Sequence, residues 1–500
     1  MLELIKQEID RQENFTETEN GAVAYKTAGS ALVDINFAVS SLRSSSEDEI
    51  IQMFDAAFNE NKEYAIKWLF FARDVRQGLG ERRLFRTCYK RLAELDIDLF
   101  YNNLHNISEY GRWDDLIALI GVSNVTDQHI IKIINEQLKE DLTNFNQGKP
   151  ISLLAKWMPS ENASSLSTKR MAKKVRQSLQ LTPRKYRLML SKLRAYSNVV
   201  EVKMCNNQWS DIDYEQVPSL ANLKYKNAFM EHDRERRLQF LSSVNNGEAK
   251  INMAVATPVD VVSRYGSWYV MEYDETLETA WKNLTDITIG DTLVVADGSG
   301  SMTVAVSGNT TALDVANSLA IYTSEHNSGI YKNKYITFSH KPQFVEFKDS
   351  DSLHQKLLTA RSYNEVANTN IEAVFDLILG VAIQNDISQE EMVQNILIIS
   401  DMEFDMAQRG WGSRTNLLTQ SLFDEIKSRY NQAGYQLPRL IFWNVNSRTK
   451  AIPLTENELG VALVSGFSQN VLKMVMSNKY DPYAVLIEII TAPRYDQIVY

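Results

Sequence analysis

The strongest constraint on the fold is a short apolar strand that runs directly into a polar loop. This stretch, residues 292–302, reads TLVVADGSGSM and carries Asp297, Ser299 and Ser301 at a spacing of two residues. An aspartate and two hydroxyls on the loop that leaves a buried strand supply hard oxygen ligands that converge on one point, which suits Mg²⁺ or Mn²⁺. The alternative is that these residues only form a turn or a helix N-cap.

Two later segments carry further oxygen donors. Thr369 stands just before an amphipathic helix in NTNIEAVFDLILGVA, and Asp401 follows the apolar run NILIIS. Open α/β sheets form their ligand sites at the carboxyl ends of strands. We therefore expect one site for Mg²⁺ or Mn²⁺ built from Asp297, Ser299, Ser301, Thr369 and Asp401.

The donor set predicts a cation that accepts an outside ligand. Two carboxylates and three hydroxyls, some acting through water, leave an octahedral Mg²⁺ incompletely coordinated by the protein. An acidic side chain or a phosphate would suit the open position. Metal-dependent hydrolysis would also need a general base and a substrate pocket, which the sequence does not indicate. Glu403 and Asp405 are close in sequence, but we expect them to be solvated charges on an exposed loop, and we predict no catalytic residue.

The pattern of the chain changes near Asp286. Before this point amphipathic segments follow one another, which predicts an α-helical module of the HEAT type over residues 1–286, with an irregular link at 246–286. After it, strands and helices alternate, which predicts a mostly parallel, doubly wound sheet domain over residues 287–500. The expected strands are Thr292–Ala296, Lys334–Phe338, Gln343–Phe347, Asn395–Ser400, Arg439–Val445 and Val461–Val464.

Composition excludes several classes of protein. The 500 residues, with 44% apolar and 23% charged side chains, are typical of a multidomain globular protein. Two cysteines and six unpaired histidines indicate neither a disulfide framework nor a zinc site. No apolar run approaches the ~20 residues that span a bilayer, and the first residues lack an apolar signal region. We therefore expect a cytoplasmic protein without a membrane partner.

A basic block stands out against the net charge of −10. From Lys169 to Arg194 the chain has ten Lys or Arg residues and no acidic one. Such a block is typical of a phosphate-binding stripe, although it also occurs as a solvated helix face. The candidate phosphate contacts are Lys169, Arg170, Lys173, Lys174, Arg176, Arg184, Lys185, Arg187, Lys192 and Arg194.

Two other charged segments have an ordinary structural explanation. Asp74 and Arg76 lie close to Gly78, and Arg112 is followed by Asp114 and Asp115. A glycine between two helices usually ends the first helix as its C-cap, and an aspartate at the start of a helix usually serves as its N-cap. We expect these charges to serve the fold rather than a ligand.

Five segments together resemble the Ro autoantigen family, in which a TROVE module of helical repeats carries a C-terminal von Willebrand factor A domain. DGSGSM, followed by Thr369 and Asp401, resembles the metal-ion-dependent adhesion site of A domains, and the resemblance covers nearly the whole chain. An uncharacterised Ro-like family of phages, bacteria and some eukaryotes is more similar still. The segments are TENGAVAYKT (18–27), FARDVRQGLGERRLF (71–85), EYGRWDDLI (109–117), WSDIDYEQVPS (209–219) and DGSGSM (297–302).

The resemblance implies a non-enzymatic RNA-binding scaffold. In Ro proteins structured RNA lies on the outer face of a helical ring and single-stranded ends enter its hole; whether the present helices close into a ring stays open. On charge grounds the basic block is the candidate RNA surface, with Tyr186 available to stack on a base. The A domain would bind a partner's acidic residue through its metal, or help to close the ring.

Two alternatives remain. In the first, the chain is a metal-dependent adaptor that works with a protein partner, such as an AAA+ ATPase, and binds no nucleic acid. In the second, it is a metal-dependent nuclease or phosphatase. The loop at Asp297 lacks the second acidic residue of an aspartyl-phosphate phosphatase, because Ser299 stands in that place.

Overall fold

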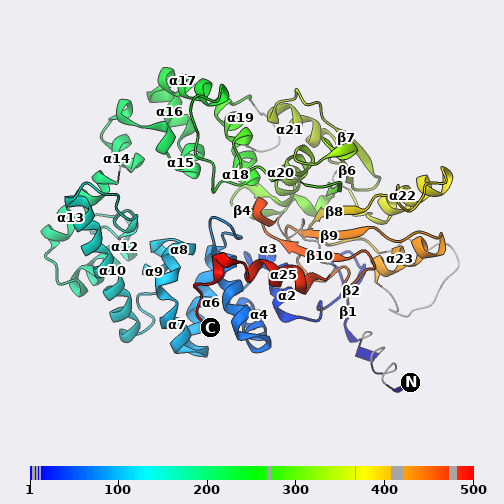
Figure 1. Cartoon of the computed structure of the whole chain (residues 1–500), viewed down its shortest axis with the longest axis horizontal. Helices are drawn as coiled ribbons and strands as arrows, with labels where there is room; N and C mark the ends of the chain where they lie inside the picture. The colour runs from blue at the N-terminus through cyan, green and yellow to red at the C-terminus, as the bar shows by residue number, and fades with distance from the viewer. Residues whose placement is uncertain are drawn as a thin grey trace. The chain divides into compact units, whose positions relative to one another are not determined.

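Each of the two units of the chain is assembled from separate segments (Figure 1). The computed structural model describes residues 1–500 except 3–5, 7–8, 11–12, 198, 267–271, 288, 366, 407–420 and 472–480. Unit 1 comprises Met1–Ala65 and Met253–Ala492, and unit 2 comprises Ile66–Asn252 and Pro493–Tyr500. The predicted boundary at residue 286 therefore differs from the division in space.

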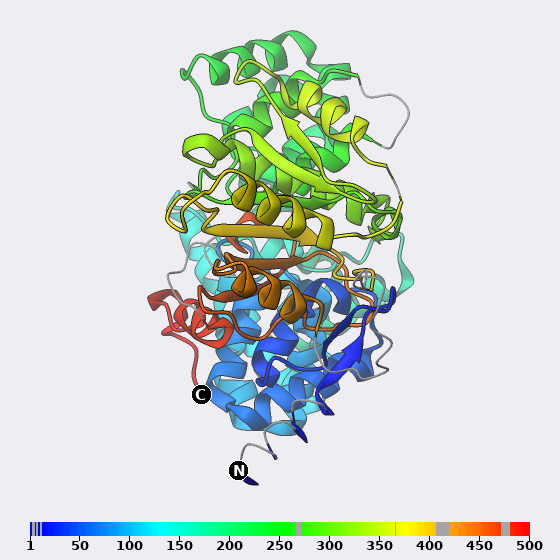
Figure 2. The ribbon, with the colours of Figure 1, turned by 90° about the vertical axis from the view of Figure 1, so that its right-hand side faces the viewer.

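Unit 1 is built on a six-stranded sheet with the order β10-β9-β8-β3-β6-β7. All neighbouring strands are parallel except β7, which is antiparallel to β6 at the edge. Figure 2 shows β8 (yellow) and β9 (orange) side by side. Each strand lies within one residue of its predicted range, which confirms the mostly parallel sheet. The strands are β3 (Leu293–Asp297), β6 (Lys334–Phe338), β7 (Gln343–Glu346), β8 (Asn395–Ser400), β9 (Arg439–Asn444) and β10 (Val461–Ser465).

The order of the strands reverses beside β3. From β3 the chain continues to β6 and β7 on one side, and later returns to β8, β9 and β10 on the other. Ligand crevices form at such reversals, beyond the carboxyl ends of the strands. Ala296 of β3 is paired with Ile399 of β8, so Asp297 and Ser400 end their strands next to each other. All five residues of β3 are buried, and α20 (Ala312–Glu325) packs against this strand.

The first residues of unit 1 form a β-hairpin, whereas the sequence predicts only helices there. β1 (Phe15–Glu17) pairs with β2 (Val23–Tyr25), and Gly21 adopts a φ of +84° in the turn. Tyr25 also pairs with Ile452. Strands of three residues carry little local signal, because such strands depend on partners that lie far away in the sequence.

The segment expected to be an irregular link also folds within unit 1. Its described residues include α18, which packs on α20, and α19. Among the other helices, α2 and α25 pack against β10, α4 packs on α2, and α21 packs on α20. A short hairpin of β4 (Ala305–Ser307) and β5 (Thr310–Thr311) follows β3. The helices other than α20 are α2 (Ala31–Phe37), α3 (Val39–Leu42), α4 (Glu47–Glu60), α18 (Pro258–Val262), α19 (Glu275–Lys282), α21 (Leu353–Ser362), α22 (Glu372–Gln384), α23 (Leu422–Gln432) and α25 (Pro482–Ile490).

The described residues of unit 2 form helices joined by loops and contain no strand, as the sequence predicts. In Figure 1, α10, α12 and α13 lie together, and α15, α16 and α17 form another group. Within the described part of the chain, no helix has both the length and the apolar character needed to cross a bilayer. The helices are α5 (Lys62–Arg73), α6 (Arg82–Leu95), α7 (Ile97–Asn102), α8 (Ile107–Tyr110), α9 (Trp113–Ile117), α10 (Asn124–Asn146), α11 (Leu154–Trp157), α12 (Leu166–Ser178), α13 (Pro183–Tyr196), α14 (Val200–Cys205), α15 (Ser219–Lys224), α16 (Lys226–His232) and α17 (Arg234–Asn245).

Residues 493–500 belong to unit 2 rather than to the sheet domain in which the sequence analysis places them. Arg494 forms a bidentate ion pair with the buried Asp74, with Nη2 at 2.9 Å from Oδ1. The amide of Asn103 exchanges hydrogen bonds with the backbone of Val499, at 2.8 and 3.0 Å. Asp74 therefore serves the fold, as expected.

Candidate functional site

The two predicted carboxylate ligands lie at the ends of adjacent strands. Asp297 ends β3, and Asp401 follows the last residue of β8, Ser400. The Ser400 hydroxyl donates to Asp297 Oδ2 at 2.6 Å, and the backbone N–H of Ser299 donates to Oδ1 at 2.9 Å. Asp297 and Asp401 are 1% and 0% exposed. The parallel pairing of β3 with β8 thus brings both buried carboxylates to the same edge of the sheet, where the charge of Asp297 acts on Asp401.

The three predicted hydroxyl ligands lie on loops that are tied together. Ser299 Oγ and Ser301 Oγ are 3.0 Å apart on the loop after β3. The backbone of that loop bonds to the next one, because Gly300 N donates to the carbonyl of residue 367 at 3.0 Å. Thr369 is buried, and its N–H donates to Asp405 Oδ2 at 3.0 Å, so the Thr369 loop is held against the loop that carries Asp401.

Burial makes it unfavourable for both carboxyl groups to carry a negative charge. Burial raises the pKa of Asp297, and hydrogen bonds from Ser299 and Ser400 oppose the shift. Burial also raises the pKa of Asp401 to about 7; the charge of Asp297 adds to the shift, while Arg448 and Ser301 oppose it. Two carboxylates in one low-dielectric site resist ionising together, and a divalent cation removes this cost.

The chemistry of the donors fits a hard divalent cation. Among the described residues, none donates a hydrogen bond to the buried Oδ2 atom of Asp401. The described residues also contain no group of three or more His, Cys, Asp or Glu side chains that could hold a metal, so any ion at this site would depend on hydroxyl and water ligands. Such a set suits Mg²⁺ or Mn²⁺ rather than zinc.

Glu403 is buried, so the expectation of a solvated charge on an exposed loop is wrong for this residue. It is 0% exposed, and its carboxylate accepts hydrogen bonds from the N–H groups of Glu19, Arg448 and Thr449 at 2.7, 2.6 and 2.9 Å. The Ser447 hydroxyl adds another at 3.1 Å. These donors commit Glu403 to holding loops together rather than to base catalysis.

Two residues beside the oxygen donors were not predicted from the sequence. Arg448, on the loop after β9, places Nη1 at 3.4 Å from Asp401 Oδ2. Asn20, in the β1–β2 turn, directs Nδ2 to the carbonyl of Glu403 at 2.6 Å and to Thr369 Oγ1 at 3.4 Å. One feature of the sequence could have pointed to Arg448: it follows β9, and the loops that follow parallel strands lie at the edge of the sheet where ligands bind. No local pattern marks Asn20.

The basic block forms α12 and α13 of unit 2, and most of its cations are exposed. Lys174 pairs with Asp127 at 2.5 Å and Lys192 lies 4.2 Å over the ring of Phe145, yet both remain exposed. The exposed members are Lys169, Arg170, Lys173, Lys174, Arg184, Lys185, Arg187 and Lys192.

Three residues of the block serve the fold instead. Arg176 donates to Glu161 at 2.7 Å and to the carbonyl of Leu181 at 2.8 Å. Arg194 donates to two backbone carbonyls and a serine hydroxyl at 2.7 to 2.8 Å, so we remove both arginines from the candidate phosphate contacts. Tyr186 is fully buried and donates to the carbonyl of Pro159 at 2.7 Å, so the expectation that it stacks on a base is wrong.

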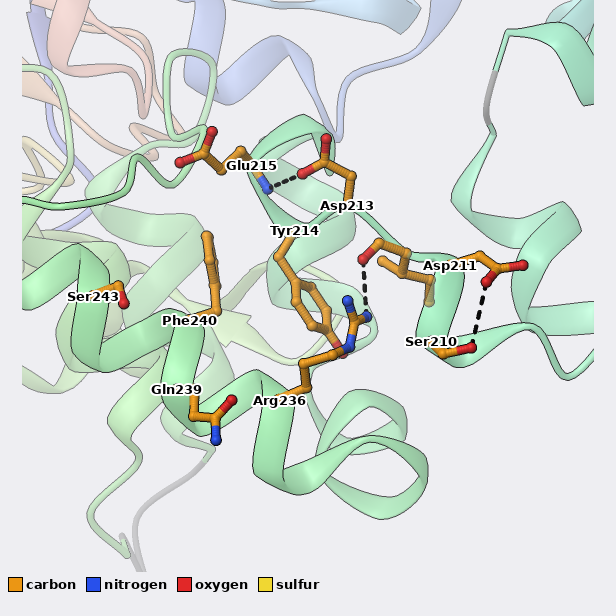
Figure 3. Close-up of a pocket in the computed structure, with 10 residues that line it drawn as sticks. Ser210, Asp211, Asp213, Tyr214, Glu215, Arg236, Gln239, Phe240 and Ser243 are labelled. Carbon is orange, nitrogen blue, oxygen red and sulfur yellow. Dashed lines mark hydrogen bonds between the residues drawn. The ribbon is translucent and has the colours of Figure 1, made fainter.

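A hollow of about 510 Å³ in unit 2 is a poor site for a phosphate (Figure 3). Arg236, which lines it, donates to Asp233 and to the carbonyls of residues 209 and 212. The exposed carboxylates of Asp211, Asp213 and Glu215 make the hollow negative. The residues that line it are Ser210, Asp211, Ile212, Asp213, Tyr214, Glu215, Arg236, Gln239, Phe240 and Ser243.

A viral protein is similar to this chain over nearly its whole length. It is the "Uncharacterized protein L728" of Acanthamoeba polyphaga mimivirus, which is 32% identical over 520 residues, covering 95% of this chain and 87% of the viral one. The chain belongs to the family of this viral protein.

Two domain models also match, each described as a domain of unknown function. DUF2828 matches residues 18–132 and 162–288, and DUF7788 matches residues 291–484. The first match includes the basic block, and the second includes all five predicted metal ligands. The two matches meet between residues 288 and 291, close to the point where the sequence changes from helical segments to alternating strands and helices. The two compact units divide the chain differently, because each consists of two separate segments.

Proposed function

We propose that this protein is a non-enzymatic RNA-binding scaffold of the Ro-like class. The observation that carries the proposal is the exposed face of α12 and α13, where eight cations stand in a stretch without any acidic residue. Lysines and arginines that contact phosphates release counterions, which gives RNA binding a favourable free energy that weakens with salt.

The sheet unit is proposed to be a von Willebrand factor A-type domain that binds Mg²⁺ or Mn²⁺. The central position of β3, the DGSGSM loop and the buried carboxylates of Asp297 and Asp401 support this. Ser299, Ser301 and Thr369 would complete the protein ligands. The ion would supply a Lewis-acidic site for a partner's Asp or Glu side chain.

Neutralising the basic face should weaken RNA binding. We expect K169Q/R170Q/K173Q to lower the affinity for a hairpin RNA and for a single-stranded RNA by at least about tenfold, because three phosphate contacts are lost. The slope of log K against log [salt] should become shallower by about 2 for single-stranded RNA. Fluorescence anisotropy at several salt concentrations measures both quantities.

A variant with the same change in net charge is the matched control. K132Q/K224Q/R234Q removes three exposed cations of unit 2 that lie outside the basic block, and should bind RNA almost as well as the wild type. Equal losses of RNA affinity in both variants would mean that binding depends on the overall charge of the protein and not on the basic face. Absence of RNA binding by the wild-type protein at low salt would overturn the proposal.

A second candidate is a metal-dependent adaptor that binds protein and no nucleic acid. It is favoured by the loss of Arg176, Arg194 and Tyr186 from the proposed RNA face. In contrast, the two carboxylates proposed as metal ligands, Asp297 and Asp401, are buried at the ends of adjacent strands. Partner recovery in pull-downs should then require Mg²⁺ and disappear in D401N. Recovery that is unchanged by EDTA and by D401N would exclude this candidate.

A further inference from the structure

The guanidinium group of Arg448 is shared between a buried carboxylate, that of Asp401, and an exposed one, that of Glu19. Nη1 lies 3.4 Å from Asp401 Oδ2, and Nε pairs with the carboxylate of Glu19 in the β1–β2 turn. Asp401 is buried, whereas the Glu19 side chain is 54% exposed. One cation therefore contacts two acidic partners at once, and only one of them is a proposed metal ligand.

Both residues are anchored to the same buried group. The N–H of Arg448 donates to Glu403 Oε1 at 2.6 Å, and the N–H of Glu19 donates to Oε2 at 2.7 Å. Asn20 adds a hydrogen bond to the carbonyl of Glu403 at 2.6 Å and lies 3.4 Å from Thr369 Oγ1. The turn and the loop after β9 are thus held beside the proposed metal ligands at a defined distance.

We propose that Arg448 is a resident cation of the metal centre that competes with the divalent ion for Asp401, and that Glu19 holds the guanidinium once the ion binds. This inference rests on the proposed metal function. A guanidinium and a divalent ion a few Å apart repel each other at a buried site of low dielectric constant, so each weakens the binding of the other to Asp401. Arg448 then makes metal binding weaker than the ligand set alone would give.

The test is Mg²⁺ binding by the full-length protein, measured by isothermal titration calorimetry, with Mn²⁺ as a second probe. We expect R448Q to bind Mg²⁺ at least about tenfold more tightly than the wild type, because the competing charge is gone. R448K, which keeps the charge, should stay close to the wild type. E19Q should bind Mg²⁺ more weakly, since the guanidinium loses its other partner and the region loses a negative charge.

Competition predicts that R448Q binds Mg²⁺ more tightly and E19Q more weakly than the wild type. A purely structural role of the two residues would weaken metal binding in both variants. K450Q is the matched control: Lys450 lies on the same loop and pairs with Glu49, so its loss should leave the affinity unchanged. Unchanged or weaker binding by folded R448Q overturns the proposal. If R448Q fails to fold, E19Q decides, and unchanged or tighter binding by E19Q overturns the proposal.

The two proposals also fail in different ways. A wild-type protein that binds the metal while R448Q shows the same affinity removes only the role of Arg448. A lack of Mg²⁺ and Mn²⁺ binding by both the wild type and R448Q removes the metal function together with this inference.

Discussion

Replacing Asp297 or Asp401 with asparagine is expected to lower the affinity for Mg²⁺ by at least about 100-fold. Each replacement removes one of the two proposed charged ligands, which are both buried. The Oδ2 atom of Asp401 accepts no hydrogen bond from the described residues. An amide keeps the shape of the side chain and loses the charge that holds a divalent ion. Calorimetric titration with Mg²⁺ and thermal unfolding with and without the metal measure the effect.

In the absence of metal, the replacement of Asp401 should not lower the unfolding temperature. Burial raises the pKa of both carboxyl groups, which means that the fold disfavours their charged forms. D401N should therefore unfold in EDTA at a temperature no lower than that of the wild type. D386N, which changes an exposed carboxylate after α22, should affect neither property. Metal binding that survives in D297N and D401N would contradict the assigned ligands.

The second large effect is expected from D115A in unit 2, which should lower the free energy of unfolding by about 3–5 kcal/mol. Asp115 is 0% exposed and accepts hydrogen bonds from Arg73 Nε at 2.8 Å and Arg86 Nε at 2.7 Å. It also caps the start of α9 by accepting from the N–H of Arg112 at 3.0 Å. Without Asp115, the buried guanidinium of Arg73 loses the charge that offsets its desolvation.

The neighbouring aspartate is the control. Asp114 pairs with Arg86 and Arg112, but its side chain is 23% exposed and solvent weakens these pairs. D114A should cost about 1 kcal/mol or less. Urea unfolding followed by circular dichroism compares the two variants. Similar losses in both would contradict the assignment of Asp115 as the central buried charge of this cluster.

Local sequence was sufficient to predict the sheet because parallel strands buried on both faces are continuous apolar runs. The run NILIIS, for example, became β8 without a change in its bounds. The same reasoning placed polar residues at the carboxyl ends of strands, so the gathering of Asp297 and Asp401 could be expected from their positions alone. Their role as metal ligands stays a prediction.

Other features depend on contacts between distant residues. Glu19 and Glu403 are 384 residues apart in the chain, yet their hydrogen bond helps to hold the hairpin against the loop that carries Asp401. The hairpin was expected to be helical, and Glu403 was expected to be solvated. Neither outcome can be read from nearby residues, because short strands and buried charges are stabilised by partners that folding supplies.

Periodicity and spacing specified the strands, the helical character of unit 2 and the positions of the oxygen donors, because these depend on neighbours within a few residues. Contacts between residues far apart in the chain determine which charged side chains stay exposed and which bind partners inside the protein. It committed Arg176 and Arg194 to internal acceptors, and it brought Arg448 to Asp401. The reason is that a charged side chain is equally polar in every sequence context, whereas its partners are chosen by the packing of the whole unit.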